Sequence, residues 1–530
     1  MEIRLVSPLS LAFAAAAYIV WRLFRIFLRH HTSSLQYLRG PKPRSWLLGN
    51  LAEIYDSQEW VEQYGDTLRF GGILNTDALL TIDTKALNHI LNNTASYRRP
   101  SLARSGISDF MGKESLISVS NDDSLNVSPQ SPAFGPAQVR EFTEIFLLKS
   151  IELARLWGLK CTEPGPVCVD VVDGLSKMTL DVIGLAGASE TPTSLGFVHG
   201  KPNELNQAFD TVFRSGTGGA SPFKLLKLFF PPLGCLPVSG TKEVRNAYRT
   251  MRKIGERLID EKRETTSRVR GWQEDHRQRD LLTLLIKANT DPSIPESERL
   301  TDEEILAREF LVAGHETTSN VTAWALYSLS IEQHVQMRLR EECLTIPTDY
   351  PTMDDLNDLP YLDSVVRETL RLHPPLNSSM WEATKTDIIP LNKPYIDVYG
   401  RPHDYVQVDK DCLVQIPILA VNRSKAIWGE DALEFRPERW DRVPQAAQKV
   451  PGTWSNMMTF LGGPRACIGY RFSLTERVQH TLIFTLIRTF EFELAVPKDD
   501  VVRQNASIQR PVLRSALDKG SQLPMFIRHI

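Results

Sequence analysis

The chain has 530 residues, of which 42% are hydrophobic and 24% are charged, and its formal net charge at pH 7 is −3. This composition is typical of a globular protein with a large core, and the near-neutral charge excludes the basic surface of a nucleic-acid-binding protein. The six cysteines are scattered without a CxxC pair, which indicates a reducing compartment in which most of them are buried and unreactive.

Residues 1–30 are predicted to form an N-terminal membrane anchor. Leu5–Trp21 is 17 residues long and carries no charge. That length is just enough to cross a hydrocarbon core of about 30 Å. Arg22, Arg25 and Arg29 follow, and this positive excess predicts a single-pass span with the bulk of the protein in the cytoplasm. A cleaved secretory signal is the alternative, because the apolar run is short and rich in alanine.

A connector at 31–50, stiffened by Pro41 and Pro43, precedes a body at 51–530 that we interpret as one domain. Long helical patterns dominate this body and short β-like pieces, such as 405–419, lie between them. The predicted fold is therefore mainly α with small β-sheets. The helical patterns cover 139–160, 241–266, 279–288, 301–331, 332–345, 361–372 and 471–491.

The helical pattern at 301–331 has an unusual centre. Ala313 and Gly314 remove side-chain bulk there, and Gly disfavours a helix by up to about 1 kcal/mol. Glu316 and Thr317 then place polar groups among apolar neighbours. Such a helix either makes room for a ligand and directs the Thr317 hydroxyl at it, or packs closely against a neighbouring helix.

Two further patterns contain charged residues suited to pairing. In "ETLRLHPP", Glu368 and Arg371 are three residues apart on a predicted helix that ends at Pro374 and Pro375, so their spacing predicts an ion pair. In "FRPERW", Arg439 supplies a second arginine from a loop. Taken singly, each pattern more often belongs to a solvated surface than to a functional site.

The stretch "FLGGPRACIGYRF" at 460–472 places Cys467 among three glycines, with Arg465 two residues before it. Glycines let a backbone approach something bulky and flat. A single sulfur with no cysteine or histidine nearby cannot hold zinc or an iron–sulfur cluster, which need about four ligands, whereas a haem iron needs only one from the protein. The arginine indicates an anion close by.

Taken together and in this order, these patterns resemble the cytochrome P-450 superfamily of haem-thiolate monooxygenases over essentially the whole chain after the anchor. The glycine-rich loop matches the family's F-x-x-G-x-R-x-C-x-G motif, with Phe460, Gly463, Arg465, Cys467 and Gly469 at its defined positions. This loop is the most specific of the matches.

The other patterns fit the same family. The run at 313–318, "AGHETT", is similar to its oxygen-activating helix, Glu368 and Arg371 to its E-x-x-R pair, and Arg439 to the arginine that joins that pair. The wording of "AGHETTS" and of "VNRSK" at 421–425 is similar to membrane-anchored fungal members, many of which act in secondary metabolism or xenobiotic oxidation.

The resemblance implies a haem b cofactor whose iron is bound by the thiolate of Cys467, with Arg465 paired to a haem propionate. It implies that Ala313 and Gly314 leave room for dioxygen. Thr317 would hold a water or the bound oxygen species, and Glu316 would supply protons. Glu368, Arg371 and Arg439 would be structural, holding the cysteine side of the haem.

The resemblance also implies hydroxylation of a small lipophilic substrate, such as a terpenoid, a steroid or an aromatic compound. Phe310, Val312, 376–380 and the 101–115 loop would line its pocket. Electrons would come from NADPH through a partner NADPH–cytochrome reductase, because the sequence has no G-x-G-x-x-G in a βαβ setting. The implied location is the endoplasmic reticulum membrane, with the catalytic domain in the cytoplasm.

Two departures from the family pattern affect propionate binding. The segment 115–131, just before "PAFGP", has no arginine, lysine, histidine or tryptophan, and Trp381 stands where a second propionate-binding arginine is common. The first departure reflects either real divergence or a gene model that is wrong at this segment.

Two alternative functions remain: a haem-binding but catalytically silent member, and an isomerase or dehydratase that needs no reductase. The retained Glu316 and Thr317 favour a monooxygenase over both.

Overall fold

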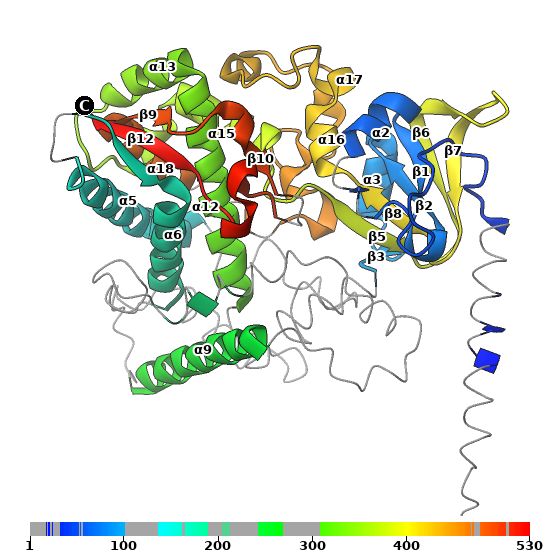
Figure 1. Ribbon diagram of the computed structural model, residues 1–530, viewed down its shortest axis with the longest axis horizontal. Helices are drawn as coiled ribbons and strands as arrows, with labels where there is room; N and C mark the ends of the chain where they lie inside the picture. The colour runs from blue at the N-terminus through cyan, green and yellow to red at the C-terminus, as the bar shows by residue number, and fades with distance from the viewer. Residues whose placement is uncertain are drawn as a thin grey trace, which may run out of the picture. The chain divides into compact units, whose positions relative to one another are not determined.

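The structure of the protein, a computed structural model, describes most of the chain from Thr32 onwards (Figure 1). At 136–143, 183–188, 248, 258–259, 261–263, 265–268, 308–313 and 478 it describes the backbone alone. The described residues are 17–18, 20–21, 24, 32–51, 53–54, 57–100, 136–161, 165–188, 204, 207–208, 211, 242–268, 308–467, 469–470, 478–504 and 508–530.

Several predictions from the sequence fall outside these residues. The predicted span Leu5–Trp21 is almost wholly outside them, as are the atypical segment 115–131 and the helical pattern at 279–288. Within the described ranges, no helix is both long enough and apolar enough to cross a bilayer. The N-terminal anchor therefore stays a prediction.

The described residues divide into two compact units. The first contains those within Met1–Leu102 and Ser379–Pro417, and the second contains those within Ala103–Ser215, Thr241–Ser378 and Ile418–Ile530. The prediction of one domain over 51–530 concerns how these units are joined, and it also stays a prediction.

The first unit is built on a five-stranded sheet whose strands come from distant parts of the chain (Figure 1). Its strand order is β1 (Thr67–Gly71), β2 (Asp77–Thr81), β8 (Leu413–Ile416), β5 (Ser379–Ala383) and β3 (Tyr97–Arg98). Only β2 and β8 pair in parallel; the other neighbours are antiparallel. A separate hairpin joins β6 (Asp387–Ile396) and β7 (Pro402–Val408). The β-like pattern at 405–419 is thus confirmed.

One buried carboxylate ties a helix of the first unit to this hairpin. Asp83 caps α3 (Thr84–Asn92) by accepting hydrogen bonds from the backbone of Lys85 and Ala86. Its two oxygens also accept from the backbone of Asn392 and Lys393 in β6. Asp83 therefore satisfies donors from both elements at once.

The second unit is mainly helical and is centred on α12 (Arg308–Ile331). That helix packs against α6 (Val171–Ala188), α18 (Val478–Thr489) and α15 (Pro360–Leu372). Its second half is buried on nearly every side, as expected for a helix surrounded by other elements. The buried apolar side chains there are Val321, Ala323, Trp324, Ala325, Leu326 and Leu329.

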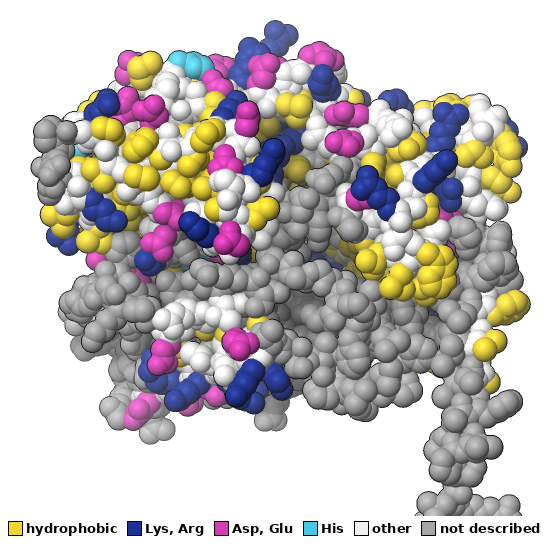
Figure 2. All heavy atoms as spheres, viewed as in Figure 1, with side chains coloured by type: hydrophobic (Ala, Val, Ile, Leu, Met, Phe, Trp, Pro, Cys, Tyr) yellow, Lys and Arg dark blue, Asp and Glu magenta, His cyan; other side chains and the backbone are white. Residues whose placement is uncertain are grey.

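Most of the predicted helices are confirmed with shifted ends. The structure places α5 at Pro136–Gly158, α9 at Lys242–Arg268 and α13 at Gln333–Leu344, close to the predicted ranges. In α9, Val244, Ala247 and Met251 are buried, while the charged side chains that the structure describes on this helix, of both signs, are exposed (Figure 2). This spacing is that of one helix face.

The helix α6 was not among the predicted helices. Asp170 precedes it and accepts from the backbone of Val172, while Leu175, Met178 and Val182 recur at helical spacing and are buried. An aspartate followed by apolar residues at helical spacing predicts the start of a helix, so the sequence did contain a signal for α6. A small sheet, β4 (Val167–Asp170), β12 (Pro524–His529) and β9 (Phe490–Leu494), and a hairpin of β10 (Val501–Arg503) and β11 (Pro511–Leu513) complete the unit.

Candidate active site

The E-x-x-R pair lies fully buried on α15. Pro360 occupies the first turn of this helix, where its missing N–H has no partner to lose. Glu368 and Arg371 are one turn apart, and both side chains are 0% exposed. Arg371 donates to Glu368 Oε2 from Nε at 2.9 Å and to Oε1 from Nη2 at 2.7 Å. This two-pronged contact uses the fixed fork of the guanidinium.

The remaining donors of Arg371 hold a segment that follows the helix. They reach the backbone oxygens of Asn422 at 2.8 Å, Ala432 at 2.7 Å and Glu434 at 3.2 Å. All five N–H groups of the guanidinium are therefore used, as a buried arginine requires. A lysine, with three donors and no fork, could not make this set.

Arg439 extends the cluster from η8 (Pro437–Asp441). Its Nε lies 3.3 Å from Glu368 Oε1, and its Nη1 donates to Asp431 Oδ1 at 2.6 Å. Burial by itself lowers the pKa of Arg439, but its hydrogen bond to Asp431 and the charge of Glu368 outweigh burial and raise that pKa. Hydrogen bonding from Arg439 lowers the pKa of Asp431 in return. The structure thus brings the three predicted structural residues together.

The loop that carries Cys467 is made of two short 3₁₀ turns, η10 (Met458–Phe460) and η11 (Gly463–Arg465). Gly463 has a φ of +68°, which an L side chain rarely adopts, so glycine is needed there. The backbone N–H of Cys467 donates to the carbonyl of Phe460 at 2.9 Å and closes the loop.

Two buried side chains that the sequence analysis did not single out fasten this loop to α15. Asn422, in α16 (Ile418–Arg423), donates to Thr459 Oγ1 at 2.8 Å and accepts from the backbone of Met458 at 2.9 Å. Thr459 in turn donates to the carbonyl of Leu370 at 2.8 Å. Asn422 lies in "VNRSK", so the resemblance of that run to fungal members was the only signal for it.

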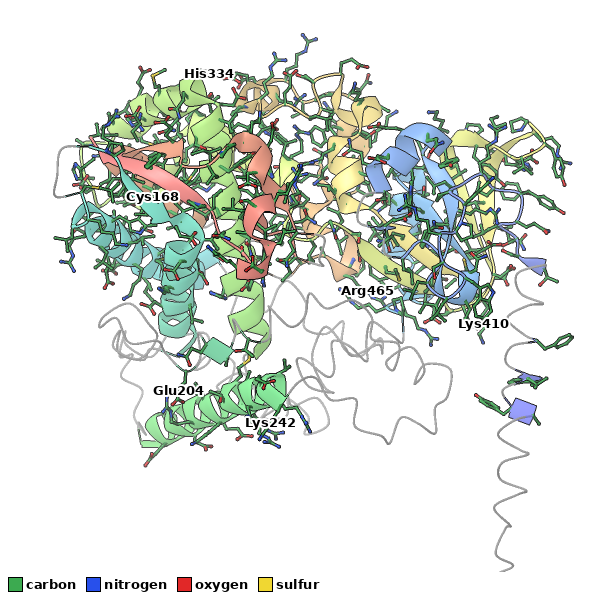
Figure 3. All side chains as sticks on the ribbon, in the orientation of Figure 1. Cys168, Glu204, Lys242, His334, Lys410 and Arg465 are labelled. Atoms are coloured by element: carbon green, nitrogen blue, oxygen red, sulfur yellow. The ribbon has the colours of Figure 1, made fainter. Side chains whose placement is uncertain are left out.

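The pKa of the Cys467 thiol is raised, although its side chain is exposed to solvent. Burial raises the pKa of its thiol, and a hydrogen bond from the backbone of Gly469 lowers it in part. The side chain is nevertheless exposed. A Cβ built at Gly469 would lie 3.9 Å from the Cys467 sulfur, which is an ordinary van der Waals contact. Arg465 lies two residues before the sulfur, half-buried at the end of η11 (Figure 3).

The polar centre of α12 carries the other predicted site residues. Glu316 is buried and Thr317 is half-buried, while Gly314 and Ala313 continue the helix before them. The side chain of Ala313 lies outside the described part of the structure. α15 packs against both α12 and η10.

Three polar side chains surround Glu316. Its Oε2 forms an ion pair with Arg510 at 2.8 Å and accepts from Asn320 at 3.1 Å. Its Oε1 lies 3.8 Å from Nδ1 of His315. His315 is held on its other side, where Nε2 lies 2.9 Å from the carbonyl of Ser176. A proton on Nε2 would donate to that carbonyl, and the Ser176 hydroxyl lies 3.0 Å from the same nitrogen.

Trp381 occupies a buried position in β5 and pairs with Val414 of β8. The guanidinium of Arg99 lies 5.9 Å from the centre of its ring, within the same unit. The tryptophan is thus packed into the sheet as an apolar residue and offers no charge at the place where the family pattern commonly has an arginine.

The match to a family model agrees with this arrangement. Residues 39–513 match the model of cytochrome P-450, so the chain belongs to the cytochrome P-450 family. It is a monooxygenase of that family, whose fold is helical with small sheets and whose cofactor is a haem with thiolate-bound iron.

Fungal relatives resemble the chain over nearly its whole length. Cytochrome P-450 monooxygenase 205 of Postia placenta is 48% identical over 532 residues, covering 98% of this chain and 97% of the relative. Cytochrome P-450 monooxygenase 128 of the same fungus is 46% identical, covering 97% and 96%. A ganoderic acid synthetase of Ganoderma lucidum is 32% identical, covering 98% and 97%.

Proposed function

We propose that this monooxygenase hydroxylates a small lipophilic substrate, with Cys467 as the iron ligand and with Glu316 and Thr317 as the residues that manage protons. The observation that carries the proposal is the Cys467 sulfur, which is exposed at the end of a glycine-rich loop and approached by the backbone N–H of Gly469. A sulfur in that setting suits a metal cation, because coordination keeps a thiolate deprotonated even where burial opposes it.

The residues around this sulfur fit a haem. Cys467 would bind the iron, and the backbone N–H of Gly469 would tune the sulfur by hydrogen bonding. Arg465 would pair with a propionate as a charge-assisted contact. The positive φ of Gly463 keeps the loop tight, and Gly469 places no side chain beside the sulfur, 3.9 Å from where a Cβ would lie. Glu368, Arg371 and Arg439 hold the segments on which this loop rests.

The haem supplies reductive activation of dioxygen, which inserts one oxygen atom into a substrate C–H bond. The protein must deliver the protons that this activation consumes and must prevent uncontrolled protonation from solvent. Glu316, which contacts Arg510, Asn320 and His315, would pass protons along α12. The Thr317 hydroxyl, next in the helix and half-buried, can both donate and accept, so it would orient the last proton.

Terpenoids, steroids and aromatic compounds are the substrate classes we propose, because an apolar pocket would favour them. The Ganoderma lucidum relative is named for ganoderic acid synthesis, which supports a role in secondary metabolism. We propose NADPH, through a flavoprotein reductase, as the electron source. We also propose that the N-terminal segment anchors the protein in the endoplasmic reticulum membrane, with its catalytic part in the cytoplasm.

Spectroscopy and turnover test the proposal in sequence. The full chain is expressed with its haem, reduced and treated with carbon monoxide. The red-shifted Soret band of a thiolate ligand is expected. NADPH consumption is then measured with added reductase against a panel of lipophilic compounds that shift the ferric spectrum. Absence of the thiolate band would refute the role of Cys467.

The buried Trp381 favours one second candidate, a haem-binding member without turnover. Its indole cannot pair with a propionate carboxylate as an arginine would, so haem binding depends more on Arg465. A thiolate band without substrate-dependent NADPH consumption in the same experiment would support this second candidate.

A further inference from the structure

The ion pair between Glu316 and Arg510 links the centre of α12 to the hairpin of β10 and β11. Arg510 stands immediately before β11, and its carbonyl accepts from the backbone of Gln504 at 3.0 Å, which closes the hairpin beyond the last paired residues. From there its Nη2 reaches Glu316 Oε2 at 2.8 Å. Both side chains are only 11% exposed, so the contact is largely shielded from water and salt.

The hairpin is fixed against its surroundings beside Arg510. The indole N–H of Trp324 donates to the carbonyl of Gln509 at 3.3 Å, two turns further along α12 from Glu316. The backbone N–H of Gln509 donates to the carbonyl of Pro375 at 2.8 Å, in the loop that follows α15. The backbone from which Arg510 extends is therefore held to α12 at a second point, and the guanidinium has a fixed origin.

The contacts of Glu316 divide its two oxygens between different roles. Arg510 and Asn320 both approach Oε2, and the Asn320 side chain also donates to the Glu316 carbonyl at 2.6 Å. The other oxygen, Oε1, faces Nδ1 of His315 at 3.8 Å. The ion pair therefore selects one orientation of the carboxylate, in which Oε2 is held by Arg510 and Asn320 and Oε1 faces His315.

We propose that Arg510 is a positioning residue for proton delivery: it holds the Glu316 carboxylate in one orientation and so sets how fast protons pass along α12. The inference rests on the proposed role of Glu316 and extends it to a residue far away in sequence. A purely structural ion pair would be equally buried. The two roles differ in whether removing the guanidinium alters proton-dependent kinetics in a protein that still folds.

The experiment compares haem-loaded variants in which the guanidinium is replaced. Arg510→Gln removes the charge and Arg510→Lys keeps it without the fork. Arg514→Gln, which alters an exposed arginine four residues on, is the matched control. Reductase-supported NADPH oxidation, with dioxygen as the only oxidant, is measured in H2O and in D2O. The reduced, CO-treated spectrum is recorded for every variant.

We expect Arg510→Gln to keep the thiolate CO band and to slow NADPH oxidation at least about fivefold, since a 1 Å displacement of a catalytic group can reduce a rate about a hundredfold. The solvent isotope effect should rise, because proton delivery becomes slower than the other steps. Arg510→Lys should fall between the wild type and Arg510→Gln, and the Arg514→Gln control should match the wild type.

A double variant separates action through Glu316 from an independent effect. Glu316→Gln should raise the solvent isotope effect by itself, and adding Arg510→Gln should change it no further. A double-mutant cycle of thermal unfolding gives a second readout. It compares the haem-loaded wild type, the two single variants and the double variant, and the stability losses of the two single variants should not add.

Three outcomes would overturn the inference. One is an unchanged isotope effect in Arg510→Gln, even with a lowered melting temperature, because that is the behaviour of a structural contact. The second is an effect that adds fully to that of Glu316→Gln. The third outcome applies if Arg510→Gln loses the CO band. Arg510→Lys is then the deciding variant, and a solvent isotope effect equal to that of the wild type in Arg510→Lys refutes the positioning role of Arg510. Loss of the band in the wild type would refute the proposed function itself.

Discussion

Replacing Glu368 by glutamine tests the buried cluster most directly, because the substitution changes the charge and almost nothing of the shape. Glu368 Oε1 accepts from Arg371, from Arg439 and from the backbone of Arg436, and Oε2 accepts from Arg371 Nε. A glutamine can keep one oxygen. Its amide N–H groups would then face a donor of Arg371, so one hydrogen bond becomes a donor–donor contact.

The expected loss follows from burial and from the partners that remain. Breaking a fully buried ion pair by removing one partner destabilises a protein by about 3–5 kcal/mol. Arg439 keeps Asp431 at 2.6 Å, so its charge stays compensated, whereas Arg371 keeps only carbonyl partners. We therefore expect a loss near the lower end, about 3 kcal/mol, which is a large share of the roughly 5–15 kcal/mol that keeps a protein folded.

Urea unfolding of the haem-loaded protein, followed by circular dichroism and by the Soret band, measures this loss. The control is Glu434→Gln, the same substitution on an exposed side chain of the neighbouring segment, where a change below about 0.5 kcal/mol is expected. Both probes should move to lower urea together in Glu368→Gln, with an unchanged slope. An unfolding midpoint within error of the wild type would refute the reasoning about this cluster.

Three further predictions concern Cys467, Thr317 and the loss of stability at acid pH. Cys467→Ala should abolish the thiolate CO band and all turnover, whereas Cys168→Ala, on an exposed cysteine, should leave both intact; a thiolate band in the first variant would exclude Cys467 as the ligand. Thr317→Ala should keep the band but lower the product formed per NADPH by about tenfold, within what a positioned proton donor contributes, and tight coupling would remove its role. Hydrogen bonding from Arg439 lowers the pKa of Asp431 below its ordinary 3.8, so its stabilisation is complete above that value and is lost as the pH falls through the lower one. Melting temperatures between pH 7 and pH 3 should therefore fall less steeply below pH 4 in Asp431→Asn than in the wild type; equal slopes would contradict this.

The motifs were readable in the sequence because each depends on local spacing. Residues three apart on a helix share a face, so the pairing of Glu368 with Arg371 follows from their spacing alone. The glycines around Cys467 indicated a tight loop, and one of them, Gly463, has the positive φ that only such a residue adopts easily. The helical period likewise located α9, α12, α13 and α15.

The partners of these residues were not readable, because they are set by contacts between distant segments. Nothing near Glu316 in the sequence indicates Arg510, which comes from a hairpin close to the other end of the chain. Asn422 and Thr459 carry no charge pattern, and their role appears only when α16 and the cysteine loop meet α15.

The sequence by itself determined the family, the iron ligand to test and the residues that mark the oxygen-activating helix, since these depend on residue type and short-range spacing. Only the tertiary structure decided how the buried charges are neutralised. A charge removed from water needs partners at hydrogen-bond distance, and the chain supplies them from segments that come together only when it folds. The five filled donors of Arg371 and the Arg510 that holds Glu316 are both consequences of that requirement.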